Sequence, residues 1–132
     1  MAEQNKKIFI IDDDTFLLNM YALKFTKSNY QVLTAQNGND ALSKLKDGSY
    51  QPDIVLIDVI MPGLDGLELL AEIRKLNLVP NSAIIMLTNQ SDTADIEKAK
   101  ALQVNGYIVK ATTIPSEVIT QVGQIYSESH KK

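Results

Sequence analysis

The sequence predicts an α/β domain in which a parallel β-sheet carries helices on both faces. Five short apolar runs rich in β-branched residues alternate with five longer amphipathic stretches. This alternation is typical of a parallel sheet, because each helix returns the chain to the start of the next strand. The length of 132 residues suits one hydrophobic core. We therefore expect a single domain over residues 1–132, with a core of about residues 6–126 and a short polar C-terminal tail.

The five apolar runs are the expected strands, and they differ in how strongly apolar they are. The third and fourth are apolar throughout, as a strand buried on both faces should be. The second is weaker, which suits an edge of the sheet. The expected strands are Ile8–Ile11, Val32–Ala35, Ile54–Ile57, Ala83–Leu87 and Tyr107–Val109.

Each run is followed by a stretch with apolar residues at helical spacing. The first helix is expected from about Thr15 to Lys27 with Asp14 as its cap, and Ser91 or Asp92 can cap the fourth. Pro115 suits the first turn of the fifth. The positions at helical spacing are Leu17, Met20, Tyr21, Lys24 and Phe25, then Ala41, Leu42 and Leu45, then Leu67, Leu70, Ile73 and Arg74 with Leu69 and Leu76 alongside, then Ile96, Ala99 and Leu102, and finally Val118, Val122, Ile125 and Tyr126. The charged residues of the fourth helix, Asp95, Glu97, Lys98 and Lys100, are expected to form a solvated surface.

Composition excludes several kinds of chemistry. The chain has no cysteine, so thiol catalysis, thiolate zinc sites and iron–sulfur clusters are excluded. Its single histidine, His130, lies in the C-terminal tail, which argues against a Ser-His-Asp triad or a two-histidine metal site. The net charge of −3 argues against a nucleic-acid-binding domain, which is normally basic. The N-terminal residues precede only four apolar positions, too few for a signal peptide or a membrane span, so we expect a cytoplasmic protein with no membrane partner.

Polar residues follow four of the five expected strands. In an open α/β sheet, ligands bind beyond the carboxyl ends of the strands, so these residues should meet at one rim. Asp14 is better explained as a helix cap than as part of a site. The residues that follow the strands are Asp12, Asp13 and Asp14 after the first, Asp58 after the third, Thr88 after the fourth and Lys110 after the fifth.

The chemistry of this set points to phosphoryl transfer. Asp12, Asp13 and Asp58 would repel one another at close range, which favours a bound divalent cation. Oxygen ligands suit Mg²⁺, whose coordination is usually completed by water and by phosphate oxygens of a substrate. One carboxylate could then act as a nucleophile toward phosphorus. The cation, the Lys110 ammonium and the Thr88 hydroxyl would neutralise the charge on the transferred group.

Four segments of the chain resemble the receiver domain of bacterial two-component response regulators of the chemotaxis type. The resemblance covers roughly Lys6 to Tyr126, and its most specific part is Asp58 followed by Met-Pro-Gly-x-Asp-Gly three residues later. It implies a flavodoxin-like fold with a five-stranded parallel sheet in the order 2-1-3-4-5. The segments are Ile8–Asp14, Pro52–Gly66, Ile84–Thr88 and Gly106–Lys110.

The resemblance also implies a role for each residue at the rim. Asp58 would be the phosphoacceptor. Asp13 and Asp58 would bind Mg²⁺ directly with the backbone carbonyl of Ile60, and Asp12 would hold the ion through water; Mn²⁺ could replace Mg²⁺. Lys110 resembles the lysine that pairs first with the acceptor aspartate and then with the phosphoryl group.

Two further positions resemble the switch of this family. Thr88 resembles the hydroxyl residue that moves toward the phosphate. Tyr107 resembles the aromatic rotamer switch that partners read on the face of the fourth helix, the fifth strand and the fifth helix.

The chain departs from the family pattern beside the rim. The residue after Lys110 is usually proline in a cis peptide, but here it is Ala111. A cis bond before a non-proline residue costs about 2.5–4 kcal/mol, so we expect a trans bond with a rearranged loop or a strained cis bond. The residue after Thr88 is usually small, but here it is Asn89. Ile60 and Gln90 occupy positions that tune the lifetime of the aspartyl phosphate, and we expect Ile60 and Asn89 to slow hydrolysis by crowding water.

The resemblance implies that the phosphoryl donor is another protein, a sensor histidine kinase or a histidine phosphotransfer protein. It implies a downstream protein target or an output domain, and it allows a phosphorylation-dependent dimer. Such a domain catalyses its own phosphorylation and hydrolysis, but its task is signalling, so we do not class it as an ordinary enzyme. No output domain follows the fifth helix, so the chain is either a stand-alone receiver or part of a longer protein.

Two alternatives remain open from the residues. One is a small aspartate-nucleophile phosphatase of the haloacid-dehalogenase type with Asp12 as nucleophile. That family would place a threonine two residues after its second aspartate and would add a cap domain, and both are absent here. The other alternative is a receiver-like interaction module that is never phosphorylated.

Overall fold

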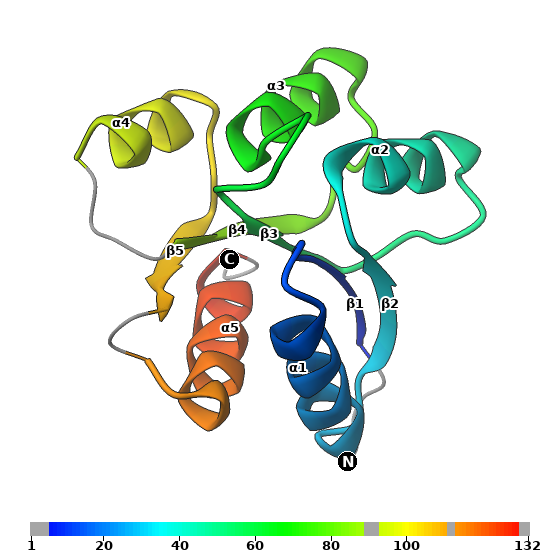
Figure 1. Ribbon diagram of the computed structural model, residues 1–132, viewed down its shortest axis with the longest axis vertical. Helices are drawn as coiled ribbons and strands as arrows, with labels where there is room; N and C mark the ends of the chain where they lie inside the picture. Colours follow the sequence, from blue (N-terminus) through cyan, green and yellow to red (C-terminus); the bar gives the residue numbers. More distant parts are fainter. Residues whose placement is uncertain (1–5, 89–92, 111–112, 130–132) are drawn as a thin grey trace.

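A computed structural model describes residues 6–88, 93–110 and 113–129 of the chain. Five parallel strands form one sheet in the order β2-β1-β3-β4-β5, which confirms the predicted topology. Helices α1 and α5 cover one face of this sheet, and α2, α3 and α4 cover the other (Figure 1). The elements are β1 (Lys7–Ile11), α1 (Thr15–Lys27), β2 (Gln31–Ala35), α2 (Gly38–Asp47), β3 (Ile54–Asp58), α3 (Gly66–Leu76), β4 (Ala83–Thr88), α4 (Thr93–Ala101), β5 (Gly106–Val109) and α5 (Pro115–Ser129).

Alternation along the strands divides the interior into two hydrophobic cores. Successive side chains of a strand point to opposite faces, so Ile8 and Ile10 pack toward α1 and α5 while Phe9 and Ile11 pack toward α2 and α3. Every residue of β3 and β4 is buried, as the continuous apolar runs predict. Strand β2 is only partly buried and lies at the edge of the sheet.

Helices α1 and α5 begin where the sequence predicts, but the helices do not always bury the expected residues. Asp14 caps α1, since its carboxylate accepts a hydrogen bond of 3.2 Å from the backbone N–H of Leu17. Leu18 is buried in α1, whereas Leu17 is only partly buried and Lys24 is exposed. In α3, Leu76 is 43% exposed because it is the last residue of the helix. Pro115 begins α5 as predicted, and the predicted caps Ser91 and Asp92 lie outside the described residues.

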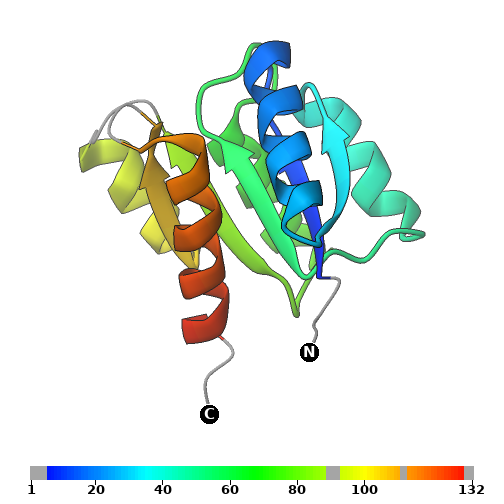
Figure 2. The same ribbon diagram turned by 90° about the horizontal axis from the view of Figure 1, so that it is seen from below.

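The carboxyl ends of the strands lie at one edge of the sheet (Figure 2). The loop that leaves β3 at this edge is closed tightly: the backbone N–H of Gly66 donates to the carbonyl of Val59 at 2.9 Å. Asp65 and Glu68 form a reciprocal capping box at the start of α3. A Cβ at Gly66 would collide with the carbonyl oxygen of Asp58, so only glycine allows α3 to start this close to the end of β3. The described residues contain no helix both long and apolar enough to span a bilayer.

This close approach predicts that Gly66→Ala destabilises the protein. The new Cβ would meet backbone atoms, which cannot rotate away, so the free energy of unfolding should fall by about 1–3 kcal/mol in urea denaturation. Gly123→Ala is the matched control. A Cβ there meets only Tyr30 Oη at 4.0 Å, and replacing a glycine inside α5 should raise stability by about 0.5–1 kcal/mol. Equal stability of Gly66→Ala and wild type would contradict the account of this loop.

Candidate functional site

Three carboxylates from two separate strand ends meet at the rim. Asp12 and Asp13 follow β1, Asp58 ends β3, and each offers an oxygen within 4.8 Å of the others. Asp12 is fully buried, Asp58 is 3% exposed, and Asp13 is exposed. Strands β1 and β3 are neighbours in the sheet, which explains why residues so far apart in the sequence come together. The cluster is therefore closed on the protein side and open to solvent beside Asp13.

Lys110 is the cation that the structure brings to this cluster. Its Nζ lies 3.0 Å from Asp12 Oδ2 and 3.3 Å from Asp58 Oδ2, and its side chain is only 8% exposed. Lys110 follows β5, which is separated from β3 by β4, so its side chain must extend past the end of β4 to reach both carboxylates. The long stem of lysine suits this span, whereas its charge balances only part of the negative charge of three aspartates.

Burial and repulsion both raise the pKa of Asp58. The pKa rises from 3.8 to about 7, first because burial disfavours the charged form and second because Asp12 is close; the Lys110 ammonium lowers it only in part. Burial alone lowers the pKa of Lys110, but attraction to Asp58 and Asp12 outweighs it, and the net direction is upward. Lys110 therefore stays charged at neutral pH. Its single positive charge is not enough to balance the negative charge of the ionised Asp58 and its neighbour Asp12.

The cluster could bind a metal ion. Asp58 Oδ1 is buried and accepts no hydrogen bond from the described residues. Buried carboxylate oxygens normally have a hydrogen-bond partner, so the lack of one at this atom is consistent with a ligand binding there. Asp12 Oδ1 accepts a 3.0 Å hydrogen bond from the backbone N–H of Asp14, which fixes the orientation of its carboxylate. Three oxygen donors with an excess of negative charge fit a hard divalent cation.

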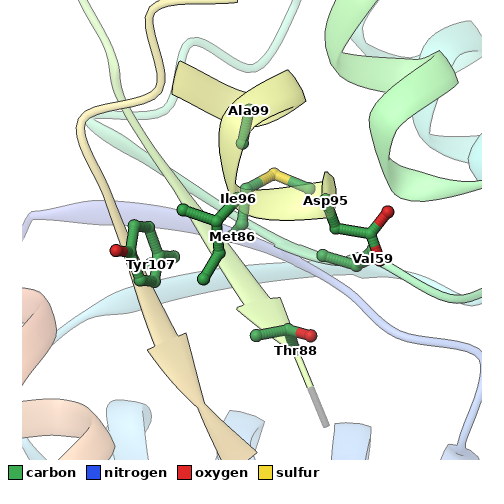
Figure 3. A pocket seen from close by; sticks show the side chains of 7 residues that line it. All are labelled: Val59, Met86, Thr88, Asp95, Ile96, Ala99 and Tyr107. Carbon is green, nitrogen blue, oxygen red and sulfur yellow. The ribbon is translucent and has the colours of Figure 1, made fainter. Parts of the chain in front are cut away.

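Thr88 and Tyr107 line a small cavity beside the cluster, and Figure 3 shows the side chains around it. Thr88 ends β4, next to Asp58 on β3, and is buried; Tyr107 lies on β5 and is 36% exposed. The cavity is small, with a volume of about 10 Å³. Its walls are Val59, Met86, Thr88, Asp95, Ile96, Ala99 and Tyr107.

The structure brings Asp12, Asp13, Asp58 and Lys110 together as the sequence analysis expects. Ile60 lies two residues beyond Asp58, and its side chain is 62% exposed. The residues Asn89, Gln90, Ala111 and His130 lie outside the described part of the chain, so the peptide state before Ala111 and the lifetime roles of Ile60, Asn89 and Gln90 stay predictions.

Asp95 is the residue that sequence reasoning placed wrongly. Glu97, Lys98 and Lys100 are exposed as expected, but Asp95 is half-buried and lines the cavity beside Thr88. The sequence spacing could have predicted this burial, because Asp95 precedes the buried Ala99 by four residues and therefore lies on the same face of the helix.

The raised pKa of Asp58 predicts a pH-dependent penalty in the metal-free protein. Between pH 3.8 and about 7 the folded state holds a proton that the unfolded state releases, so this group's contribution to stability falls as pH rises through that window. Asp58→Asn removes the penalty. The variant should have a higher free energy of unfolding than wild type at pH 8 in the presence of a chelator. At about 1.4 kcal/mol per unit of pKa shift, the difference should reach up to about 4 kcal/mol, and it should become smaller toward pH 4.

Urea unfolding at several pH values measures this difference. The control is Asp47→Asn, which replaces an exposed aspartate at the end of α2 that is not part of the acidic cluster. A pH-independent difference for Asp58→Asn would contradict the proposed electrostatics of the cluster.

Comparison with known proteins agrees with this geometry. Residues 8–122 match the response regulator receiver domain family. The alkaline phosphatase synthesis transcriptional regulatory protein PhoP of Bacillus subtilis is 32% identical over 125 residues, covering 95% of this chain and 50% of PhoP. The transcriptional regulatory protein ResD of the same organism is 33% identical over 116 residues, covering 88% of this chain and 46% of ResD. The chain thus spans about half the length of these curated relatives.

Solved structures give the same result. A CheY-like receiver domain protein from Methanospirillum hungatei superposes with a TM-score of 0.84 at 25% identity, covering 95% of this chain and 96% of the other. The receiver domain of a Francisella response regulator superposes with a TM-score of 0.79 at 29% identity, covering 95% of this chain and 99% of the other. The chain therefore belongs to the receiver domain family of two-component response regulators.

Proposed function

We propose that this receiver domain accepts a phosphoryl group on Asp58 from a phosphohistidine of a partner protein, with Mg²⁺ held by the acidic cluster. The observation that carries the proposal is the buried Asp58 carboxylate, which has one oxygen paired with Lys110 and the other without a hydrogen-bond partner among the described residues. A carboxylate in this state has a lone pair available for phosphorus.

The geometry supports Asp58 over Asp12 as the nucleophile. Asp12 Oδ1 accepts a hydrogen bond from the backbone N–H of Asp14, and Asp12 Oδ2, although it has no hydrogen-bond partner among the described residues, is ion-paired with the Lys110 ammonium at 3.0 Å. Asp58 uses only Oδ2 in its ion pair with Lys110. A phosphatase that attacks through Asp12 would first have to break these contacts, and family membership also favours the receiver function.

In the proposed reaction an Asp58 oxygen forms a bond to phosphorus while the bond between phosphorus and the donor imidazole nitrogen breaks. The bonding electron pair stays with the imidazole. The nucleophile attacks as an anion, so no general base is required. Mg²⁺ would supply positive charge to the Asp58 carboxylate and to the phosphoryl oxygens. Asp12, Asp13 and Asp58 would hold it, with the backbone carbonyl of Ile60 as a further proposed ligand.

Lys110 and Thr88 would stabilise the product. The Lys110 ammonium lies close enough to Asp58 to pair with a phosphoryl oxygen after transfer, and Thr88 ends the neighbouring strand. Movement of Thr88 toward the phosphoryl group would leave room in the cavity that it shares with Tyr107. Tyr107 would then turn inward and change the surface formed by α4, β5 and α5.

The proposed partners follow from this chemistry. Membership in the family implies a histidine kinase as partner, and a histidine phosphotransfer protein would present the same donor group. The altered surface of α4, β5 and α5 would contact a downstream protein, an output domain or a second copy of the chain. We propose a cytoplasmic signalling role rather than that of an ordinary enzyme.

Intact-mass analysis after incubation with acetyl phosphate and Mg²⁺ tests the proposal. Wild type should gain one phosphoryl group, Asp58→Asn should gain none, and the exposed-site control Asp47→Asn should behave like wild type. Chelation of divalent ions should abolish labelling. Reduction of the acyl phosphate with borohydride followed by peptide sequencing identifies the labelled residue.

The alternatives give different results in the same experiment. Label on Asp12 would support the aspartate-nucleophile phosphatase. An unlabelled wild type that also fails to bind beryllofluoride with Mg²⁺ would support an interaction module that is never phosphorylated.

A further inference from the structure

The cavity beside the acidic cluster is lined mostly by apolar side chains and by one charged side chain. Val59, Met86, Ile96 and Ala99 are apolar, and of the described lining residues Asp95 alone carries a charge. Asp95 lies in the first turn of α4, on the opposite side of the cavity from β5 (Figure 3). The same figure shows the Tyr107 ring at the cavity's edge with its hydroxyl directed away from the other lining side chains.

An inward turn of Tyr107 would bury its hydroxyl among these apolar side chains. A buried hydroxyl without an acceptor is costly, because it gives up its hydrogen bond to water. Under the proposed function Thr88 turns toward the phosphoryl group, which removes from the cavity one of the two polar side chains that line it besides Tyr107. Among the described lining residues, Asp95 then has the side chain that can accept a hydrogen bond from the Tyr107 hydroxyl.

The cavity is too small for the Tyr107 ring, so α4 must move outward to admit it. Among its described residues α4 fully buries one side chain, Ala99, whereas α3 buries four residues. An element with few buried contacts shifts at low cost. A small displacement of α4 would admit the ring between Thr88 and Ile96 and bring the Tyr107 hydroxyl toward Asp95.

We infer that Asp95 is a positioning residue for the proposed movement of Tyr107. Its carboxylate accepts a hydrogen bond from the Tyr107 hydroxyl in the phosphorylated state and so stabilises that state. The inference rests on the proposed function and adds a residue to it. By linkage, a contact made only in the activated state raises the affinity for any ligand that induces this state. Asp95 should therefore affect the binding of a phosphoryl mimic although it is not part of the acidic cluster.

A double-mutant cycle with beryllofluoride and Mg²⁺ tests this contact. Calorimetric affinities are compared for wild type, Asp95→Ala, Tyr107→Phe and the double variant. Loss of a hydrogen bond to a charged group should weaken binding about tenfold in Asp95→Ala. The same change should have almost no effect in the Tyr107→Phe background, because the hydroxyl is already absent. Asp95→Asn keeps an acceptor oxygen and should retain most of the affinity.

Glu97→Ala is the matched control, because Glu97 is an exposed acid on the same helix and does not line the cavity. It should bind beryllofluoride like wild type. An equal loss from Asp95→Ala in both backgrounds, or tighter binding caused by removal of a negative charge, would overturn the inference and leave the proposed function standing. Failure of wild type to bind beryllofluoride would instead overturn the proposed function and the inference with it.

Discussion

The structure depends on one electrostatic arrangement, in which Lys110 balances part of the repulsion between two buried carboxylates. Asp12 and Asp58 lie together in an interior that disfavours charge, and a single ammonium bridges them at 3.0 and 3.3 Å. Buried ion pairs of this kind rarely stabilise a fold, because the loss of hydration offsets the attraction. The arrangement is better understood as a site with too little positive charge of its own, which suits the proposed binding of a cation and a phosphoryl group.

The sheet topology supplies the geometry for this arrangement. Strands β1 and β3 are neighbours at the centre of the sheet, so their polar ends face each other across one strand spacing. The hydrophobic cores on both faces fix the register of these strands, because a slip of one residue would turn Asp58 and its apolar neighbours to the wrong side. Packing far from the rim therefore determines the distance between the carboxylates.

Much of this could be predicted from the sequence, and the limits have physical reasons. The apolar runs of β3 and β4 identify buried parallel strands, and the rule that ligands bind at strand ends brings Asp12, Asp58 and Lys110 together. The strand order came from the family resemblance, since apolar patterning does not specify which strands pair. The choice of Leu18 over Leu17 depends on the rotation of α1 about its axis. The position of Asp95 depends on how α4 docks, which the charge pattern alone does not reveal.

Because Lys110 extends past the end of β4 to reach the carboxylates, the site can form only when strands that are distant in the sequence are folded together. The four charged groups come from the ends of three strands, so no part of the sheet that lacks β1, β3 or β5 can assemble them, and a chain that has lost β5 lacks its only ammonium at the rim among the described residues. Under the proposed function, a molecule in which one of these strands is missing or unfolded would not accept a phosphoryl group. Phosphoryl acceptance, under the proposed function, is thereby tied to the joint folding of β1, β3 and β5.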